Sequence, residues 1–256
     1  MMLLRTWFSD SLLAPANLLT SALTAVTGVG GGMILIGLMP LLVPAAAVVP
    51  VHGVTQLASN ATRAWFGREA IDGRYIGPFL VGSLVGLAVF GVLIRYVELS
   101  LIPLFIGVYI LLITWSPMFN RLIRRFESFF WVGFLQTGLG VFVGTPGPLN
   151  IAVLNKHYDD NHVVVTTGAL MMTVVHSVKL VVYLSLGFAF IEYWQLLVMM
   201  VIMATVGSWL GTRLRQRISM LWLKKMLPWL LTMLALRLIG GIVYQQFLVH
   251  QGLAPQ

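Results

Sequence analysis

The chain contains two long apolar segments, and glycine interrupts each of them near its middle. The first runs from about residue 11 to 43 and is broken at Gly28–Gly32. The second runs from about residue 129 to 155 and is broken at Gly144–Pro148. One helical crossing of a bilayer needs roughly 20 residues, so each segment is longer than a plain crossing. Matched pairs of Gly/Pro-interrupted apolar segments are typical of the binding sites of secondary transporters. The two breaks therefore favour a membrane fold with a site where they meet.

The composition excludes an ordinary soluble domain. Of the 256 residues, 59% are hydrophobic and 9% are charged, whereas a soluble domain carries about 25% charged residues. The net charge of +8 does not indicate nucleic-acid binding, because the basic residues lie mostly in short loops, where they orient a membrane protein and contact anionic lipid. The chain has no cysteine, which excludes disulfides and thiolate metal sites. We expect a lipid bilayer and a small anion as partners, and neither metal nor cofactor.

The apolar pattern predicts an all-α polytopic membrane protein. The predicted apolar segments are 11–43, 45–67, 75–94, 99–117, 129–155, 163–186, 193–212 and 221–247. They divide into four and four. We therefore expect one integral membrane domain built from a first repeat over residues 1–120 and a second repeat over residues 121–256.

The loop charges discriminate between two topologies. If every segment crosses, six loop lysines and arginines lie on one side of the membrane and seven on the other, so the charges do not indicate an orientation of the protein. If the first and fifth segments are re-entrant, eleven share one side and only Arg5 and Arg95 lie on the other, a strong positive-inside bias. Each half then has one re-entrant segment and three crossings, so the halves are inverted and both termini are non-cytoplasmic. Eight full crossings, with kinked first and fifth helices, remain the alternative.

Three basic residues, Arg63, Lys179 and Arg237, lie inside apolar segments. A charge at the bilayer centre costs at least about 2.5–3.5 kcal/mol, so such a residue normally faces a cavity or a partner. All acidic residues lie in or beside predicted loops. We therefore expect the missing negative charge to arrive with the substrate. Arg237 has no equivalent in the other half, which favours a structural or interfacial role for it.

A weak internal repeat relates the two halves. A shift of 116 residues superposes Gly28 on Gly144, Gly31 on Gly147, Asn60 on His176 and Arg63 on Lys179; after a gap of about five, Gly86 falls on Gly207. Each polar pair is spaced i, i+3 and so projects from one helix face. An arginine and a lysine therefore occupy equivalent places.

The breaks and the polar faces together predict an anion site near the midplane. Glycine lets an anion approach the backbone, and a half-helix that begins at a break presents N–H groups and a positive dipole end. Irregular backbone at this depth is tolerated only around a cavity or buried in protein. The predicted substrate-binding residues are Gly30, Gly31, Gly32, Asn60, Arg63, Thr145, Gly147, Asn150, His176 and Lys179.

Each of these residues also has a purely structural interpretation. The first break could serve close helix packing, and the second could be a kink in an ordinary helix. Arg63 lies close to a helix end and could extend to the interface. His176 could be an interhelical hydrogen-bonding histidine.

Recognisable catalytic motifs are missing from the sequence. It contains no Gly-x-Ser-x-Gly, no His-Glu-x-x-His and no Walker motif, so we do not expect an enzyme. A secondary transporter is the preferred interpretation. An anion channel with the same site is one alternative, and a non-transporting membrane enzyme or assembly subunit is another.

The two breaks, the polar face from His52 to Arg63 and its counterpart from His176 to Lys179 make the chain resemble the TauE/SafE sulfite exporter family. The resemblance covers nearly the whole chain. It implies a multi-pass protein of the bacterial inner membrane that exports sulfite, an organosulfonate or a related sulfur-containing anion. The second break is rich in proline, unlike a plain glycine run, so the halves need not act equally. If protons are coupled, His176 is the expected carrier.

Overall fold

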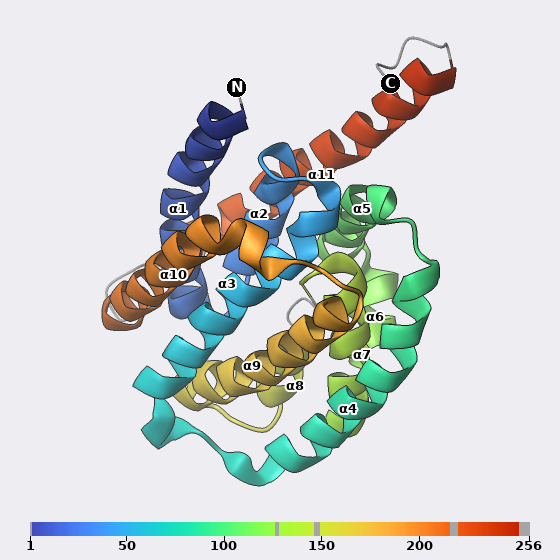
Figure 1. The fold of residues 1–256 in the computed structure, drawn as a ribbon. Coiled ribbons are helices and arrows are strands. Elements are labelled where there is room, and N and C mark those ends of the chain that lie inside the picture. The colour runs from blue at the N-terminus through green and yellow to red at the C-terminus, as the bar shows by residue number, and fades with distance from the viewer. Residues whose placement is uncertain (1, 126–127, 146–148, 216–219, 251–256) are drawn as a thin grey trace.

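The computed structural model describes residues 2–125, 128–145, 149–215 and 220–250, and the regular elements of these ranges are all helical (Figure 1). The α-helices are α1 (Met2–Thr27), α2 (Gly31–Leu38), α3 (Ala45–Phe66), α4 (Ile76–Leu93), α5 (Ile102–Trp115), α6 (Pro117–Arg124), α7 (Phe129–Val143), α8 (Leu149–Leu154), α9 (Asn161–Ser185), α10 (Trp194–Leu214) and α11 (Met220–His250). Short 3-10 segments flank them: η1 (Met39–Leu41), η2 (Arg68–Ala70), η3 (Gly73–Tyr75), η4 (Ile94–Tyr96), η5 (Leu99–Leu101) and η6 (Phe190–Tyr193).

Both interrupted segments consist of two helices with a break between them. Helix α1 ends at Thr27 and α2 begins at Gly31; α7 ends at Val143 and α8 begins at Leu149. The prediction of a helix break at each of these places is confirmed. One boundary differs from the prediction: the connection between the predicted apolar segments 99–117 and 129–155 contains most of the short helix α6.

Among the described residues, four helical stretches are long and apolar enough to cross a membrane: Gly73–Tyr96, Asn161–Ser185, Phe190–Leu214 and Lys225–Phe247. Helix α3 is 22 residues long but does not meet this criterion, because polar side chains lie along its buried face. Gln56, Asn60 and Arg63 are each at most 4% exposed. Other helices therefore shield α3, which passes through the middle of the bundle beside α9 (Figure 1).

The long helices pack in two similar pairs, α1 with α10 and α7 with α4. Small residues let these backbones approach closely, as is usual where membrane helices meet. A Cβ added to Gly86 of α4 would lie 2.9 Å from the Phe134 carbonyl oxygen of α7, and one added to Gly207 of α10 would collide with the Leu18 carbonyl oxygen of α1. In each pair, a broken segment from one half packs on a helix from the other.

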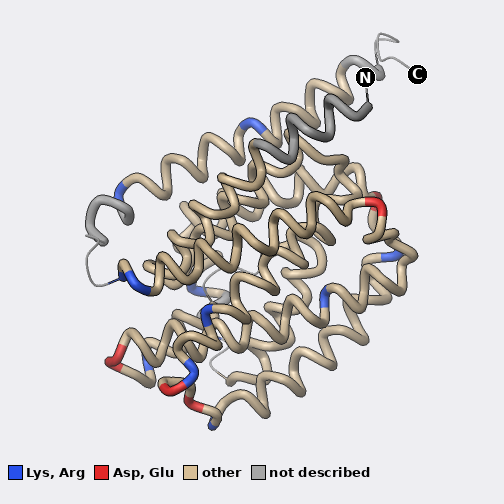
Figure 2. The backbone as a smooth tube through the Cα atoms, turned by 60° about the vertical axis from the view of Figure 1, so that its left-hand side comes forward, with Lys and Arg blue, Asp and Glu red and all other residues tan. Residues whose placement is uncertain are grey.

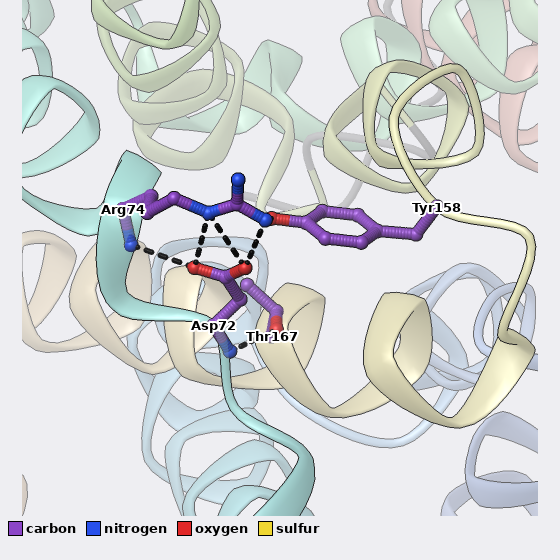
Figure 3. A network of polar contacts seen from close by, with 4 residues as sticks. All are labelled: Asp72, Arg74, Tyr158 and Thr167. Atoms are coloured by element: carbon purple, nitrogen blue, oxygen red, sulfur yellow. Dashed lines mark hydrogen bonds and ion pairs between the residues drawn. The ribbon is translucent and has the colours of Figure 1, made fainter.

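Charged residues lie mainly in the loops and at helix ends, many of them toward one edge of the bundle (Figure 2). In the described residues the one ion pair is that of Arg74 with Asp72, at 2.6 Å. The same guanidinium donates to the Tyr158 hydroxyl at 3.3 Å, and the Asp72 backbone N–H donates to the Thr167 hydroxyl at 3.0 Å (Figure 3). These contacts fasten the connection between α3 and α4 to the start of α9.

Candidate functional site

A small cavity lies where the two broken segments meet α3 and α9. The centre of a water-sized molecule can occupy about 50 Å³ of it, and one buried water needs roughly 10–15 Å³ by this measure. The cavity therefore has room for a few waters or one compact oxyanion. The lining residues are Thr24, Gly28, Val29, Gly30, Gly32, Met33, Gln56, Asn60, Arg63, Thr145, Asn150, Ile151, Gly168, Met172 and His176.

The first break places two of its three predicted glycines in the cavity wall. Gly30 has φ +98°, in the left-handed region that L side chains rarely adopt, and it precedes the first turn of α2. Gly32 also lines the cavity, and its carbonyl oxygen accepts a hydrogen bond from His52 Nε2 at 3.0 Å. Gly31 is not a lining residue. It packs against the Thr20 carbonyl and the Thr24 hydroxyl of α1, where a Cβ has no room.

The second break packs against α2, the helix that follows the first break. Gly144 has φ +72°, and a Cβ there would collide with Ile36 Cδ1 on α2. Thr145 lines the cavity, and Gly147 lies outside the described residues. Asn150 of α8 also lines the cavity. Structural hydrogen bonds hold it, because its Nδ2 donates to the Gly168 carbonyl at 2.9 Å and its Oδ1 accepts from Gln136 at 3.2 Å.

Arg63 is the cation in the cavity wall. It is only 2% exposed, so its side chain does not extend to the interface. Its Nη2 donates to Asn60 Oδ1, and Asn60 Nδ2 donates to the Gln56 carbonyl at 2.7 Å. Arg63 Nε and Nη1 are buried and have no hydrogen-bond partner among the described residues. Buried donors without partners are rare and costly, so this guanidinium is suited to an acceptor that enters the cavity.

His176 and Lys179 lie one helical turn apart on α9 but have different surroundings. His176 lines the cavity, and its Nδ1 has no partner among the described residues. The ring of His52 meets it edge-on, with centroids 6.1 Å apart. Lys179 is 0% exposed and is not a lining residue. Its Nζ donates to the Gly144 carbonyl at 2.9 Å, so Lys179 lies behind the second break.

Some lining residues were not among the predicted substrate-binding residues. Gln56 precedes Asn60 by one turn, and Met172 precedes His176 in the same way, so both lie on the helix faces that carry the predicted residues. Thr24 lies one turn before the first break. Nothing in the sequence pattern marks Ile151 or Gly168. Arg237 is exposed on α11 and is not among the lining residues, in keeping with the interfacial role expected for it.

A family model described as "Sulfite exporter TauE/SafE" matches residues 13–238, a range that includes both breaks and the whole cavity wall. The chain belongs to the TauE/SafE sulfite exporter family. No curated protein and no solved structure gives a significant match. Since TauE/SafE proteins are transporters and not enzymes, this family member is a multi-pass membrane transporter, and the family implies an anionic substrate.

Proposed function

We propose that this TauE/SafE protein exports a small sulfur-containing anion, such as sulfite or an organosulfonate, as a secondary transporter. Arg63 carries the proposal. It is a buried guanidinium with two unpartnered donor atoms in a cavity at the junction of two broken helices. Among the described residues no carboxylate pairs with it. A buried cation that lacks an acidic partner, in a cavity of this size, fits a compact anionic substrate.

The surrounding groups complete the proposed site. Asn60 holds the Arg63 guanidinium from one side, and His176 faces the cavity from α9. The breaks add backbone N–H groups and the Thr145 hydroxyl as further donors. The complete proposed set is Gly30, Gly31, Gly32, Asn60, Arg63, Thr145, Gly147, Asn150, His176 and Lys179. Of these, Gly31 and Lys179 act from behind the wall, the first by supporting the break and the second by adding positive potential.

Alternating access between two inverted halves, residues 1–120 and 121–256, is the proposed mechanism. Recurring contacts support it. Asn17 donates to the Met200 carbonyl at 2.6 Å, and Gly133 packs on the Phe79 carbonyl. Asn17 and Gly133 are 116 positions apart, the offset that superposes the breaks; Phe79 and Met200 are 121 apart, the offset that superposes Gly86 on Gly207.

The proposed orientation puts the basic loops in the cytoplasm and both termini outside, in a bacterial inner membrane. The chain has no cysteine, so single-cysteine variants report their positions cleanly. We expect Arg121→Cys and Lys156→Cys to react with an impermeant maleimide from the same face in intact cells and inverted vesicles. Reaction from opposite faces would mean that the segment between them crosses the membrane.

Export of a net anion needs no coupling ion in principle. An inside-negative potential favours outward movement by about 2.3 kcal/mol per charge per 100 mV. An anion channel with the same site would gain the same driving force, so energetics does not separate the two. A carrier exposes its site to one side at a time, and this predicts saturable exchange.

Counterflow in proteoliposomes tests the proposal. We expect liposomes preloaded with sulfite to accumulate labelled sulfite transiently, with saturation, and Arg63→Ala to abolish the accumulation. Single-channel currents in planar bilayers would favour the channel. No flux of sulfite, thiosulfate or sulfoacetate by either route, from protein that is folded in detergent, would contradict the transport function proposed here.

A further inference from the structure

Lys179 is a buried titratable group that the anion site leaves without a counter-charge. Its side chain is 0% exposed, and among the described residues its Nζ donates to the Gly144 carbonyl. An ammonium has three N–H donors to satisfy. Gly53 of α3 makes room for the lysine, since a Cβ there would lie 2.9 Å from Lys179 Cε. The lysine therefore lies in the contact between α3 and α9.

The groups near Lys179 add positive charge or none. Helix α3 contributes His52, and α9 contributes His176 and Tyr183, whose hydroxyl donates to the Val141 carbonyl at 3.1 Å; Arg63 of α3 acts on His176. Helices α4, α7 and α8 carry no titratable side chain over their lengths. Because the Gly32 carbonyl can only accept, His52 Nε2 carries the hydrogen, which leaves His52 Nδ1 without a partner among the described residues.

An anion in the cavity would change the electrostatics of this cluster. Without it, a protonated Lys179 would be a buried cation that has no counter-charge among the described residues, and such a charge is costly in a medium of low polarity. With it, the same proton would be attracted by the anion, because Lys179 donates to Gly144, the neighbour of the lining residue Thr145. His176 lines the cavity and lies one turn from Lys179, so the lysine is close enough to respond to cavity occupancy.

We propose that Lys179 binds a proton when an anion enters the cavity, so that this transporter takes up one proton with each anion. The inference rests on the function proposed above and names its coupling ion. It assigns the proton to Lys179 and not to His176, which was the carrier expected from sequence. Linkage makes the effect reciprocal: the bound anion favours the proton, and the proton favours the anion. A monoanion would then cross with no net charge, so its own gradient would have to drive its export, and the membrane potential would favour export only of an anion that carries more than one charge.

Proton uptake on binding tests the proposal directly. Calorimetric titration of the purified protein with thiosulfate is repeated in buffers of different ionisation enthalpy, since thiosulfate stays fully ionised near neutral pH. The wild type is expected to take up close to one proton per anion, and its apparent Kd should rise by up to about tenfold per pH unit in the range where Lys179 titrates.

The variants separate charge from titration. Lys179→Met should bind thiosulfate more weakly and without proton uptake. Lys179→Arg keeps a permanent charge, so its binding should also occur without uptake and should not weaken with pH. Lys225→Met removes an exposed lysine of α11 and should behave like the wild type. Size-exclusion profiles identify any variant that has misfolded.

The outcomes are distinct. Wild-type binding without proton uptake, or uptake that persists in both Lys179→Met and Lys179→Arg, overturns the assignment. Uptake that persists in the Lys179 variants and disappears in His176→Gln assigns the proton to the histidine and equally overturns it. If the wild type binds none of thiosulfate, sulfite and sulfoacetate, the failure belongs to the proposed transport function and not to the coupling.

Discussion

The predicted internal repeat superposes Arg63 on Lys179, but the two residues have different surroundings in the tertiary structure. Arg63 lines the cavity and keeps two donor atoms unpartnered among the described residues. Lys179 lies outside the lining and gives its hydrogen bond to the backbone of the second break. In the proposed site Arg63 binds the anion, and Lys179 supports the backbone of the second break. Equivalence in an internal repeat thus predicts a location, while the chemical role depends on the neighbours.

The two breaks also differ in the residues that they present to the cavity and in the side chain that holds their backbone. The first presents Gly30 and Gly32 to the cavity, and the side chain of His52 secures its backbone. The second, where described, presents Thr145, and Lys179 secures its backbone at Gly144. An imidazole supports the first break, and the amine of Lys179, the proposed proton site, supports the second.

The largest expected effect is on anion affinity in Arg63→Ala. Truncation removes charge-assisted hydrogen bonds in a buried site, a loss of about 2 kcal/mol or more, so the Kd for sulfite should rise about 30-fold or more. Calorimetric titration measures it. Arg237→Ala, which removes an exposed arginine of α11, is the matched control. An Arg63→Ala protein with near wild-type affinity would remove Arg63 from the site.

Gly144→Ala is expected to lower the thermal stability of the protein strongly. The alanine would adopt φ +72° and would also collide with Ile36. The left-handed conformation costs roughly 1–2 kcal/mol, and overpacking adds roughly 1–3 kcal/mol. Gly187→Ala has a similar φ of +80° but open space around it, so it should show the conformational cost alone. Equal melting temperatures for the two variants would contradict the contact between Gly144 and Ile36 of α2.

Lys179→Met should weaken anion binding less than Arg63→Ala does. A charge that acts from behind the cavity wall contributes on the order of 1 kcal/mol at an effective dielectric constant near 20, which corresponds to roughly tenfold in Kd at most. The comparison is made with the same anion at one pH, below the range where wild-type affinity falls. A larger loss than that of Arg63→Ala would reverse the roles assigned to the two cations.

The smallest effect concerns the contact between Asp72 and Arg74, far from the site. Hydrogen bonds from Arg74 hold the pKa of the Asp72 carboxyl well below its usual range. The ionised Asp72 carboxyl therefore stabilises the folded protein at pH values above its unfolded-state pKa, about 3.9. This stabilisation is lost as the pH falls toward the folded-state pKa. Asp72→Asn should melt at a lower temperature than the wild type at neutral pH. The difference between the two melting temperatures should shrink at acidic pH. A constant difference would mean that the carboxyl charge is not involved.

Local chemistry made much of this protein predictable from sequence. Glycine and proline runs inside apolar segments cannot continue a helix, so the positions of both breaks follow from residue type alone. The near absence of charge identifies a membrane protein, and the lack of acidic residues inside the apolar segments leaves Arg63 without an acidic partner. The helical spacing of Asn60 and Arg63 placed them on one face, and both are in the cavity wall.

Only the tertiary structure decided which polar groups meet. Asn150 lines the cavity, but its amide is held by Gly168 and Gln136; Lys179 points to Gly144, and Gly31 is pressed against α1. Sequence spacing orders residues along one helix, whereas these contacts join helices that are distant in the chain. They depend on how closely small residues let α1, α3, α7 and α9 pack against one another. This packing is determined by the whole bundle and not by any one segment.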